Sequence, residues 1–234
     1  HDSQKRYGAP KIHRLLKKKG YHVSIKRVQR LMKKAGLRSI IVKKFRPTSS
    51  KQKVVERENI LKRDFSTKTL NEKWVGDITY IYTLKHGWCY LASVMDLHTK
   101  KIVGYSFSRK MTTELIIKAL ENAYHTQKPD EGVIFHSDLG TQYTSDEFAN
   151  IIKKYGMTHS FSYKGSPYDN ACIESFHAIL KKEEVNHVQY FDYHSAKLVL
   201  FQYIESWYNR KRMHGSIGYK TPQELENEIK AVAS

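Results

Sequence analysis

Residues Ser166–Lys182, SPYDNACIESFHAILKK, are the stretch from which the rest of the chain can be interpreted. The Asp169-Asn170 pair predicts a loop ending at a helix N-cap, because short polar side chains there satisfy free backbone N–H groups. At 100° per residue, Glu174 and Lys181 share one face of the helix that follows. The opposite face is apolar and comprises Cys172, Ile173, Phe176, Ile179 and Leu180. The stretch predicts an amphipathic helix with one carboxylate in its first turn, and taken alone the polar face could simply be solvated.

Size and composition bound the class of protein. A chain of 234 residues can hold one full domain and a smaller one, and 40% hydrophobic residues is typical of a globular protein. No apolar run approaches the ~18 residues of a membrane span. Two cysteines, Cys89 and Cys172, are too few for a zinc site or a disulfide framework and suit a reducing cytoplasm. Because the sequence does not begin with Met, we expect it to be part of a longer product.

The positive charge lies almost entirely at the N-terminal end. Residues 1–63 hold 21 Lys and Arg against 3 Asp and Glu, whereas residues 64–234 hold 20 of each. The net charge of +18 therefore belongs to the first quarter of the chain. A block this basic indicates a polyanionic partner, most simply nucleic acid.

The first 38 residues predict two short amphipathic helices. Pro10 opens the first and Gly20 ends it, and Ser24 caps the second, which ends at Gly36. Such a pair with a basic second helix is a candidate helix-turn-helix, or alternatively a basic hairpin that only neutralises phosphates. The candidate DNA contacts are Lys26, Arg27, Arg30 and Lys33.

Residues 43–63 are polar and basic, so we interpret the segment as a linker that could follow a DNA backbone. A helix over 54–65 is a further expectation.

From Trp74 onwards the pattern is that of an α/β domain. Three β-branched and aromatic runs separated by turn signals predict consecutive antiparallel strands, followed by alternating helices and short strands around a mixed sheet. The expected strands are 74–83, 88–96, 101–108, 133–136 and 158–162, and the expected helices are 112–125 and 145–155 before the helix of the opening stretch. A helix with an apolar stripe from Ala196 to Trp207 and a final helix opened by a Thr221–Glu224 capping box complete the chain.

Three acids stand out by their context. Asp77 lies inside the first strand, where an uncompensated carboxylate is costly, and Asp138 ends the strand VIFHSD, at the carboxyl end where α/β sheets place their sites. Glu174 is the third, with 35 residues between it and Asp138. Carboxylates that converge from two strands and a helix form an oxygen-rich site suited to Mg²⁺ or Mn²⁺.

Several motifs together resemble one family closely. They are W-x-x-D-I-T-Y (Trp74–Tyr80), H-S-D-x-G-x-Q-Y (His136–Tyr143), S-x-x-D-N-A-x-x-E-S-F (Ser166–Phe176), Y-N-x-x-R-x-H (Tyr208–His214) and G-Y-x-T-P (Gly218–Pro222). The set resembles the OrfB part of bacterial insertion-sequence transposases of the IS-three family, which are related to retroviral integrases. The resemblance covers nearly the whole chain.

The resemblance implies a fold and a catalytic site. It implies a ribonuclease-H-like core with a mixed five-stranded sheet and a DDE active site of Asp77, Asp138 and Glu174, which would bind two Mg²⁺ ions (with Mn²⁺ as a substitute). It assigns a basic residue seven positions after the glutamate, here Lys181, to DNA. The expected domains are a helix-turn-helix domain (1–42), a basic linker (43–70), the catalytic core (71–185) and a C-terminal helical extension packed on the core (186–234).

Other residues are candidate DNA contacts with an alternative each. Gln142 and Tyr143 could touch DNA or pack their loop, and His177 could lie near the scissile phosphate or be an ordinary surface residue. The basic turn at 209–214 contributes Arg210, Arg212 and His214, either as DNA contacts or as a solvated loop. His136 favours a structural role, and no zinc pattern is present.

The function predicted from these observations is DNA transposition. Metal-dependent cleavage at the element end would expose a 3′-hydroxyl, which then attacks another phosphodiester, and the family resemblance adds a circular intermediate. Expected partners are double-stranded DNA (terminal inverted repeats and target) and further copies of the chain, at least a dimer, in the cytoplasm on the bacterial nucleoid. The alternatives are a nuclease that hydrolyses without joining and a DNA-binding protein whose core is idle.

Overall fold

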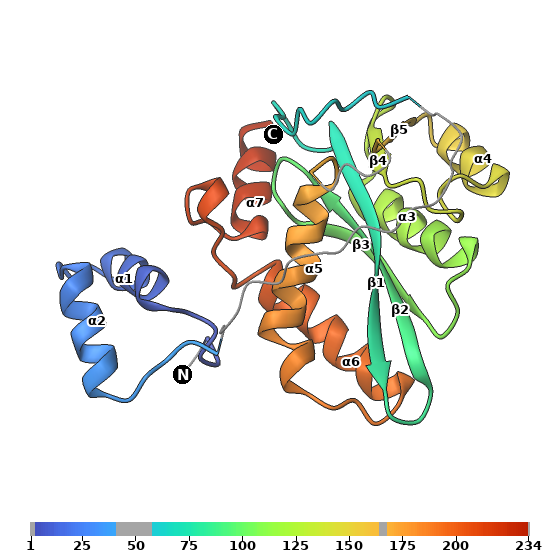
Figure 1. Ribbon diagram of the computed structural model, residues 1–234. Coiled ribbons are helices and arrows are strands. Elements are labelled where there is room, and N and C mark those ends of the chain that lie inside the picture. Colours follow the sequence, from blue (N-terminus) through green and yellow to red (C-terminus); the bar gives the residue numbers. More distant parts are fainter. Residues whose placement is uncertain (1–2, 41–57, 164–167, 234) are drawn as a thin grey trace. The chain divides into compact units, whose positions relative to one another are not determined.

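The computed structural model describes residues 3–40, 58–163 and 168–233, and the chain forms two compact units. The N-terminal unit comprises His1–Arg46 with Ile179–Val188, and the core unit comprises Pro47–Ala178 with Gln189–Ser234. Figure 1 shows the elements of both units. Among the described residues, no helix is long and apolar enough to cross a membrane.

The N-terminal unit contains two short helices, α1 (Ala9–Lys18) and α2 (Ile25–Lys34). Proline stands in the first turn of α1, where its missing N–H costs no hydrogen bond. The Ser24 side chain accepts a hydrogen bond from the backbone N–H of Arg27 and so caps α2. Both helices form where the sequence predicts them, and Val28 is the residue of α2 that is buried.

The end of helix α5 (Ala171–Glu183) and the short 3₁₀ helix η1 (Val185–His187) group with these two helices. Arg6, which is buried, donates through Nε to the carbonyl of Glu183 over 3.2 Å and forms an ion pair with Glu184. A buried arginine with two acceptors fixes the chain before α1 against residues 183–184.

The core unit is built on one five-stranded mixed sheet with the order β3-β2-β1-β4-β5. The strands are β1 (Lys73–Thr83), β2 (Gly87–Asp96), β3 (Ile102–Ser108), β4 (Ile134–Ser137) and β5 (Thr158–Phe161). The first three are antiparallel neighbours, and β4 and β5 run parallel to β1. This arrangement confirms the mixed five-stranded sheet expected from the sequence.

Helices cover the two faces of the sheet (Figure 1). Helices α3 (Thr113–Gln127) and α4 (Asp146–Lys154) lie on one side. On the other side are α5, α6 (Tyr193–Gln202), the π-helical turn η2 (Tyr203–Tyr208) and α7 (Pro222–Ala233), with the 3₁₀ helix η3 (Gly215–Ile217) before α7. Alternate residues of β1 therefore face different helices, as the two-residue period of a strand requires.

The main core lies between the sheet and α3 and α4. Trp74 and Phe135 are buried there against apolar residues of both helices. Gly104 of β3 permits the closest approach, because a Cβ at this position would lie 2.3 Å from the carbonyl oxygen of Ala119 in α3. We expect any larger residue at position 104 to push α3 away from the edge strand.

Two local expectations have different outcomes. The capping box at the start of α7 is confirmed, since the Thr221 N–H donates to the Glu224 carboxylate and the Glu224 N–H donates to Thr221 Oγ1. The helix expected over 54–65 is absent from residues 58–65, which form bends and turns, and its remainder lies outside the described residues. Asn59 and Leu61 are buried there and hydrogen-bond to the core, which fixes this segment in a non-helical path.

Candidate active site

Strand pairing brings Asp77 and Asp138 together. In the parallel pair β1–β4, Val75 lies opposite His136, and each acid follows two residues later, Asp77 within β1 and Asp138 directly after the end of β4. Because residues two apart along a strand point to the same face, both carboxylates are expected on the same side of the sheet. The β1–β4 register thus accounts for the proximity of two of the three acids.

The third acid, Glu174, is carried by the first turn of α5. The beginning of this helix is tied to β1, because Asn170 Nδ2 donates to the carbonyl oxygen of Gly76 over 3.2 Å. Gly76 is the residue before Asp77, so this single hydrogen bond links the helix that carries Glu174 to the strand that carries Asp77.

Asp169 holds the same helix end from the other side. Its carboxylate is fully buried and accepts hydrogen bonds from Asn59 Nδ2 at 3.0 Å and from the Tyr163 N–H at 2.8 Å. It also pairs with Arg63 at 2.5 Å. The sequence predicted an N-cap at this pair, whereas the Asp169 side chain binds groups outside α5. Sequence reasoning missed these partners because residues 59 and 63 lie more than 100 positions away in the chain.

Burial and the charge of Asp77 raise the proton affinity of the other two acids. Burial and then the charge of Asp77 raise the pKa of Asp138 to about 6, and burial followed by the charges of Asp77 and Asp138 raises the pKa of Glu174. Like charges disfavour ionisation only when they are close, so these shifts indicate one electrostatically coupled group. Asp138 and Glu174 retain solvent-accessible surface although protein atoms crowd their carboxyl groups, and Asp77 is half-buried, so the group remains accessible.

No three Asp, Glu, His or Cys side chains in the described parts of the chain close around a single point as a metal cage would. Neither Asp138 nor Glu174 forms an ion pair with a lysine or arginine within residues 3–40, 58–163 and 168–233. Asp77, Asp138 and Glu174 thus form a cluster of negative charge.

His177 lies beside this cluster and is not a surface residue. Its Nδ1 is 3.3 Å from the Asp77 carboxylate, its Nε2 is 3.4 Å from Ser93 Oγ, and its side chain is 7% exposed. The contact with Asp77 argues against the DNA contact considered from the sequence, because a side chain held between a carboxylate and a hydroxyl has little surface to offer. We interpret His177 as a residue that positions Asp77.

The two candidate DNA contacts in the loop after Asp138 differ in exposure. Tyr143 is buried against Phe135 and Phe148, which supports the packing alternative and argues against a DNA contact. Gln142 is partly exposed and donates to the carbonyl of Met111 over 3.4 Å. Of the two, Gln142 is the residue that can reach a ligand.

The three candidate DNA contacts in the basic turn at 209–214 also differ in exposure. Arg212 and His214 are each 7% exposed and lie within 3.5 Å of each other, with both side chains against Tyr208. Their burial argues against direct DNA contacts, because guanidinium and imidazole groups that pack internally cannot also reach a phosphate. Arg210 remains exposed.

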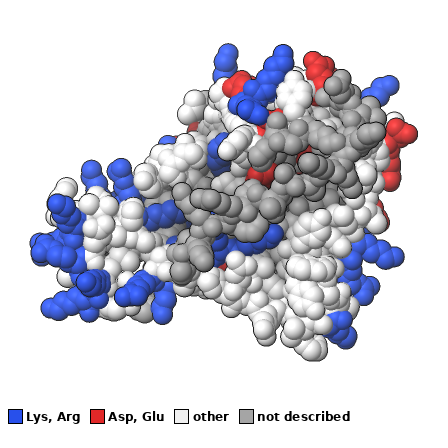
Figure 2. Space-filling view, viewed as in Figure 1, with Lys and Arg blue, Asp and Glu red and all other residues white. Residues whose placement is uncertain are grey.

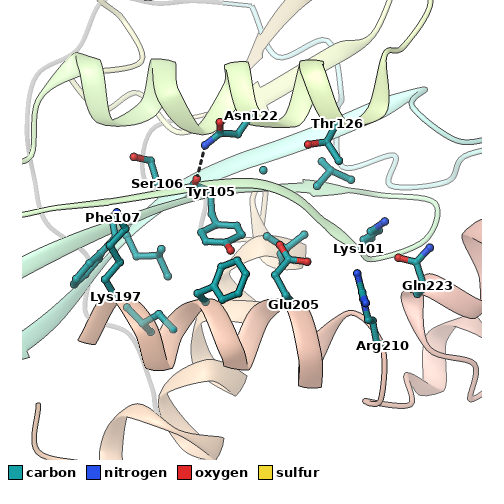
Figure 3. Close-up of a pocket in the computed structure, with 16 residues that line it drawn as sticks. Lys101, Tyr105, Ser106, Phe107, Asn122, Thr126, Lys197, Glu205, Arg210 and Gln223 are labelled. Atoms are coloured by element: carbon teal, nitrogen blue, oxygen red, sulfur yellow. Dashed lines mark hydrogen bonds between the residues drawn. The ribbon is translucent and has the colours of Figure 1, made fainter. Parts of the chain in front are cut away.

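Arg210 lines a hollow of about 490 Å³ beside the edge strand β3 (Figure 3). Asn122 of α3 donates to the carbonyl of Tyr105 at the upper wall, and Glu205 of η2 forms the lower wall. Burial and the Glu205 carboxylate raise the pKa of Tyr105. This hollow is separate from the acids, because β2 lies between β3 and the strand that carries Asp77.

The candidate DNA contacts of α2 lie on its surface. All four are exposed, and Figure 2 shows Lys and Arg gathered over the N-terminal helices. They are Lys26, Arg27, Arg30 and Lys33.

Lys181 is partly buried and follows Glu174 by seven residues in α5. His136, by contrast, is fully buried between the hydroxyls of Ser160 and Ser162, as a structural residue would be.

Family models match nearly the whole chain. Two models described as integrase core domain match residues 68–167 and 155–222, and one described as HTH-like domain matches residues 1–45. With the sheet and the acid cluster described above, these matches define an integrase-core protein preceded by a helix-turn-helix-like domain.

Individual relatives narrow the class. The chain is 38% identical over 227 residues to transposase InsF for insertion sequence IS3A of Escherichia coli (strain K12), covering 97% of this chain and 78% of that protein. It is 37% identical to the transposase for insertion sequence element IS904 of Lactococcus lactis subsp. lactis (strain IL1403), covering 97% of this chain and 89% of that protein. The chain belongs to the IS3 family of insertion-sequence transposases.

Solved structures support the fold. A chain of the simian T-cell lymphotropic virus intasome in complex with PP2A regulatory subunit B56 gamma superposes with a TM-score of 0.54 at 18% identity, covering 77% of this chain and 60% of that chain. The HTLV-2 integrase catalytic core domain in complex with magnesium (dimeric form) gives 0.50 at 18% identity, covering 67% and 97%. At this identity the likeness concerns the fold alone.

Proposed function

We propose that this chain is a DDE transposase that cleaves DNA at insertion-sequence ends and joins the exposed 3′-hydroxyl to another phosphodiester. The observation that carries the proposal is the electrostatic interaction among Asp77 of β1, Asp138 after β4 and Glu174 of α5. Family membership supports DNA as the substrate, with terminal inverted repeats and target DNA as its two forms.

The cluster fits divalent cations by the chemistry of its donors. All three groups are carboxylates, the ligand that Mg²⁺ and Mn²⁺ prefer. Burial and the charge of neighbouring acids raise the pKa of Asp138 and of Glu174, and a bound cation would relieve that repulsion. We propose two ions per site, as the resemblance to DDE transposases implies. Two Mg²⁺ ions would activate the attacking oxygen and stabilise the leaving oxygen of an in-line displacement.

The chain's own residues contribute position and charge. His177 holds the Asp77 carboxylate, and Asn170 fixes the start of α5 against β1, so the three acids keep their relative places as DNA enters. Lys181 lies about 10 Å of helical rise beyond Glu174, which is too far for a shared ion but suitable for a phosphate of the same strand. The basic face of α2 would hold the element end while the core acts on it.

The protein would act as an assembly of at least two copies, since cleavage and joining involve two DNA ends. We propose the domain division 1–42, 43–70, 71–185 and 186–234 for this enzyme, and the helix-turn-helix-like match over 1–45 supports its first boundary.

The test uses a labelled duplex that ends in the terminal repeat, with Mg²⁺ or Mn²⁺. We expect Asp77→Asn, Asp138→Asn and Glu174→Gln each to lower nicking and joining by about a thousandfold or more, because each removes one charged ligand and little volume. End binding should change less than about threefold, and a calorimetric titration with Mg²⁺ should show weaker binding without any turnover. The matched control is Glu147→Gln, an exposed acid of α4.

Activity close to that of the unchanged chain in any one of the three variants would remove that residue from the site. Hydrolysis without joined products would instead identify a nuclease. Absence of any metal-dependent nicking in the unchanged chain would leave a DNA-binding protein with an idle core.

A further inference from the structure

The outer end of the β1–β2 hairpin carries four aromatic side chains, of which Tyr90 packs partly against the main core and the other three are exposed. Cross-strand pairing places Tyr80 opposite Tyr90 and Tyr82 opposite Trp88, so the four rings share one face. They contact one another edge to face, with centroids 5.3 Å apart for Tyr82 and Trp88 and 5.4 Å apart for Tyr80 and Tyr90. We call these four residues the hairpin aromatic patch.

The hairpin aromatic patch is exposed. Tyr80, Tyr82 and Trp88 are 47%, 52% and 58% exposed, which is unusual for large rings that already contact each other. The rings extend beyond the part of the sheet face that α3 covers, where Trp74 and Ala92 are buried. Exposed aromatic clusters of this kind mark binding surfaces for proteins or for nucleic-acid bases.

Positive charge lies just after the end of the neighbouring strand β3. Arg109 and Lys110 follow the end of β3, whose last residue, Ser108, pairs with Tyr90. With four further residues they line a hollow of about 690 Å³ that contains no carboxylate: His86, Ser108, Tyr193 and His194. The nearby Asp192 caps α6, and its carboxylate accepts a hydrogen bond from the Ser195 N–H. Figure 2 shows blue side chains beside uncharged surface over this end of the hairpin.

The patch reaches the active-site loop through one residue. Tyr80 Oη lies 3.8 Å from Met111 Sδ, and the Met111 carbonyl accepts from Gln142, four residues after Asp138. A strand that leaves the acids over Gln142 would therefore meet Tyr80 next. Because the hairpin aromatic patch adjoins the active-site loop, we expect the same DNA strand to contact both.

We propose that the hairpin aromatic patch binds a DNA strand with unpaired bases, which stack on the rings while Arg109 and Lys110 hold its phosphates. The inference rests on the proposed function, since it extends the DNA path beyond the acids. Duplex bases already stack on each other, so rings with free faces favour unpaired ones. A symmetric contact between two copies is disfavoured, because it would bring the arginines and lysines of both copies together.

The position of Trp88 permits a direct measurement on the full chain. The protein has three tryptophans, of which Trp74 and Trp207 are buried, so acrylamide quenching of fluorescence reports mainly on Trp88. The probes are a duplex with a single-stranded overhang of six thymidines and a blunt duplex of the same total charge. We expect the overhang to shield Trp88 from acrylamide and the blunt duplex to shield it little.

Variants make the test specific. Trp88→Ala and Tyr82→Ala should each weaken binding to the overhang DNA by about tenfold relative to the blunt duplex. Arg109→Ala should lower the dependence of overhang binding on log salt by about one unit. The matched control is Phe201→Ala, an exposed aromatic of α6 beside the other hollow, which should change neither.

Two outcomes would overturn the inference. In the first, Trp88 stays fully accessible to acrylamide at saturating overhang DNA. In the second, Trp88 becomes shielded without DNA as the protein concentration rises, which would identify a contact between copies. Circular dichroism on each variant separates misfolding from lost binding. If DNA is still nicked and joined while Trp88 stays accessible, the proposed function stands and the hairpin assignment falls.

Discussion

In α2 of the N-terminal unit, Val28 is the residue that is buried and the basic side chains face outward. In the core unit, by contrast, three acids from β1, the end of β4 and α5 depend on a sheet, a buried tryptophan and a network of hydrogen bonds for their relative positions. The N-terminal surface can act through charge density alone, whereas the core can act only if three distant segments are held together. The two units should therefore respond differently to substitution, salt and pH.

The largest effect we expect tests whether the acid cluster depends on the hydrogen bonds that hold the start of α5. Asp169→Ala should lower the free energy of unfolding by about 3 kcal/mol, because it leaves Asn59 and the Tyr163 N–H without their acceptor in a buried place. Nicking should fall with it, while DNA affinity, which we attribute to the N-terminal unit, should be retained. Thermal and urea unfolding measure the change.

The control for this substitution is Asp130→Ala, at an exposed position between α3 and β4. Equal unfolding curves for the two variants would show that α5 is held by other contacts.

The next effect concerns the N-terminal unit. Arg27→Ala or Arg30→Ala should reduce discrimination between element-end and random DNA by about tenfold, since base contacts contribute about 1–3 kcal/mol each. Lys17→Ala, an exposed lysine of α1, should weaken both DNAs about equally. Competition binding at several salt concentrations measures both the overall DNA affinity and the discrimination between the two DNAs. If all three variants weaken binding to element-end and random DNA equally, this unit binds DNA through charge alone and differs from the core even more.

A smaller effect follows from the pKa of Asp138, which burial and Asp77 raise to about 6. Protons compete with cations for this carboxylate, so Mg²⁺ affinity should fall by up to about tenfold per pH unit below pH 6 and change little above pH 7. Calorimetric Mg²⁺ titrations between pH 5 and 8 measure this. Binding of the basic α2 surface to DNA should stay nearly constant over the same range, and a parallel loss in both would contradict the assignment.

The smallest effect is one of stability in the absence of metal. Because the pKa of Asp138 is higher in the folded than in the unfolded chain, the free energy of unfolding falls as pH rises through about 4 to 6. Asp138→Asn should remove this penalty and stabilise the metal-free protein at pH 7.5 by at most about 1 kcal/mol, since the side chain is exposed. Added Mg²⁺ should raise the melting temperature of the unchanged chain more than that of the variant. A destabilised variant would show that Asp138 is compensated in another way.

Local chemistry made much of the fold predictable. Ser24, the proline in the first turn of α1 and the Thr221–Glu224 capping box define helix starts through bonds within four residues, and each is found in the structure. The strands were predictable because alternation and β-branched residues report on burial over a few positions. The segment 58–65 was not, since its path is set by Asn59 and Leu61 hydrogen bonding to residues about 100 positions away.

The sequence by itself determined which residues could do chemistry: where the positive charge lies, which helix faces are apolar, and the acids Asp77, Asp138 and Glu174, chosen by their contexts and a family resemblance. Only the tertiary structure decided which side chains remain accessible. Tyr143, His177, Arg212 and His214 were candidate DNA contacts in the sequence and are buried, whereas Tyr82 and Trp88 lie in predicted strands and are exposed. The physical reason is that exposure depends on which elements pack against a residue, and strand register and helix placement arise from contacts between segments far apart in the chain.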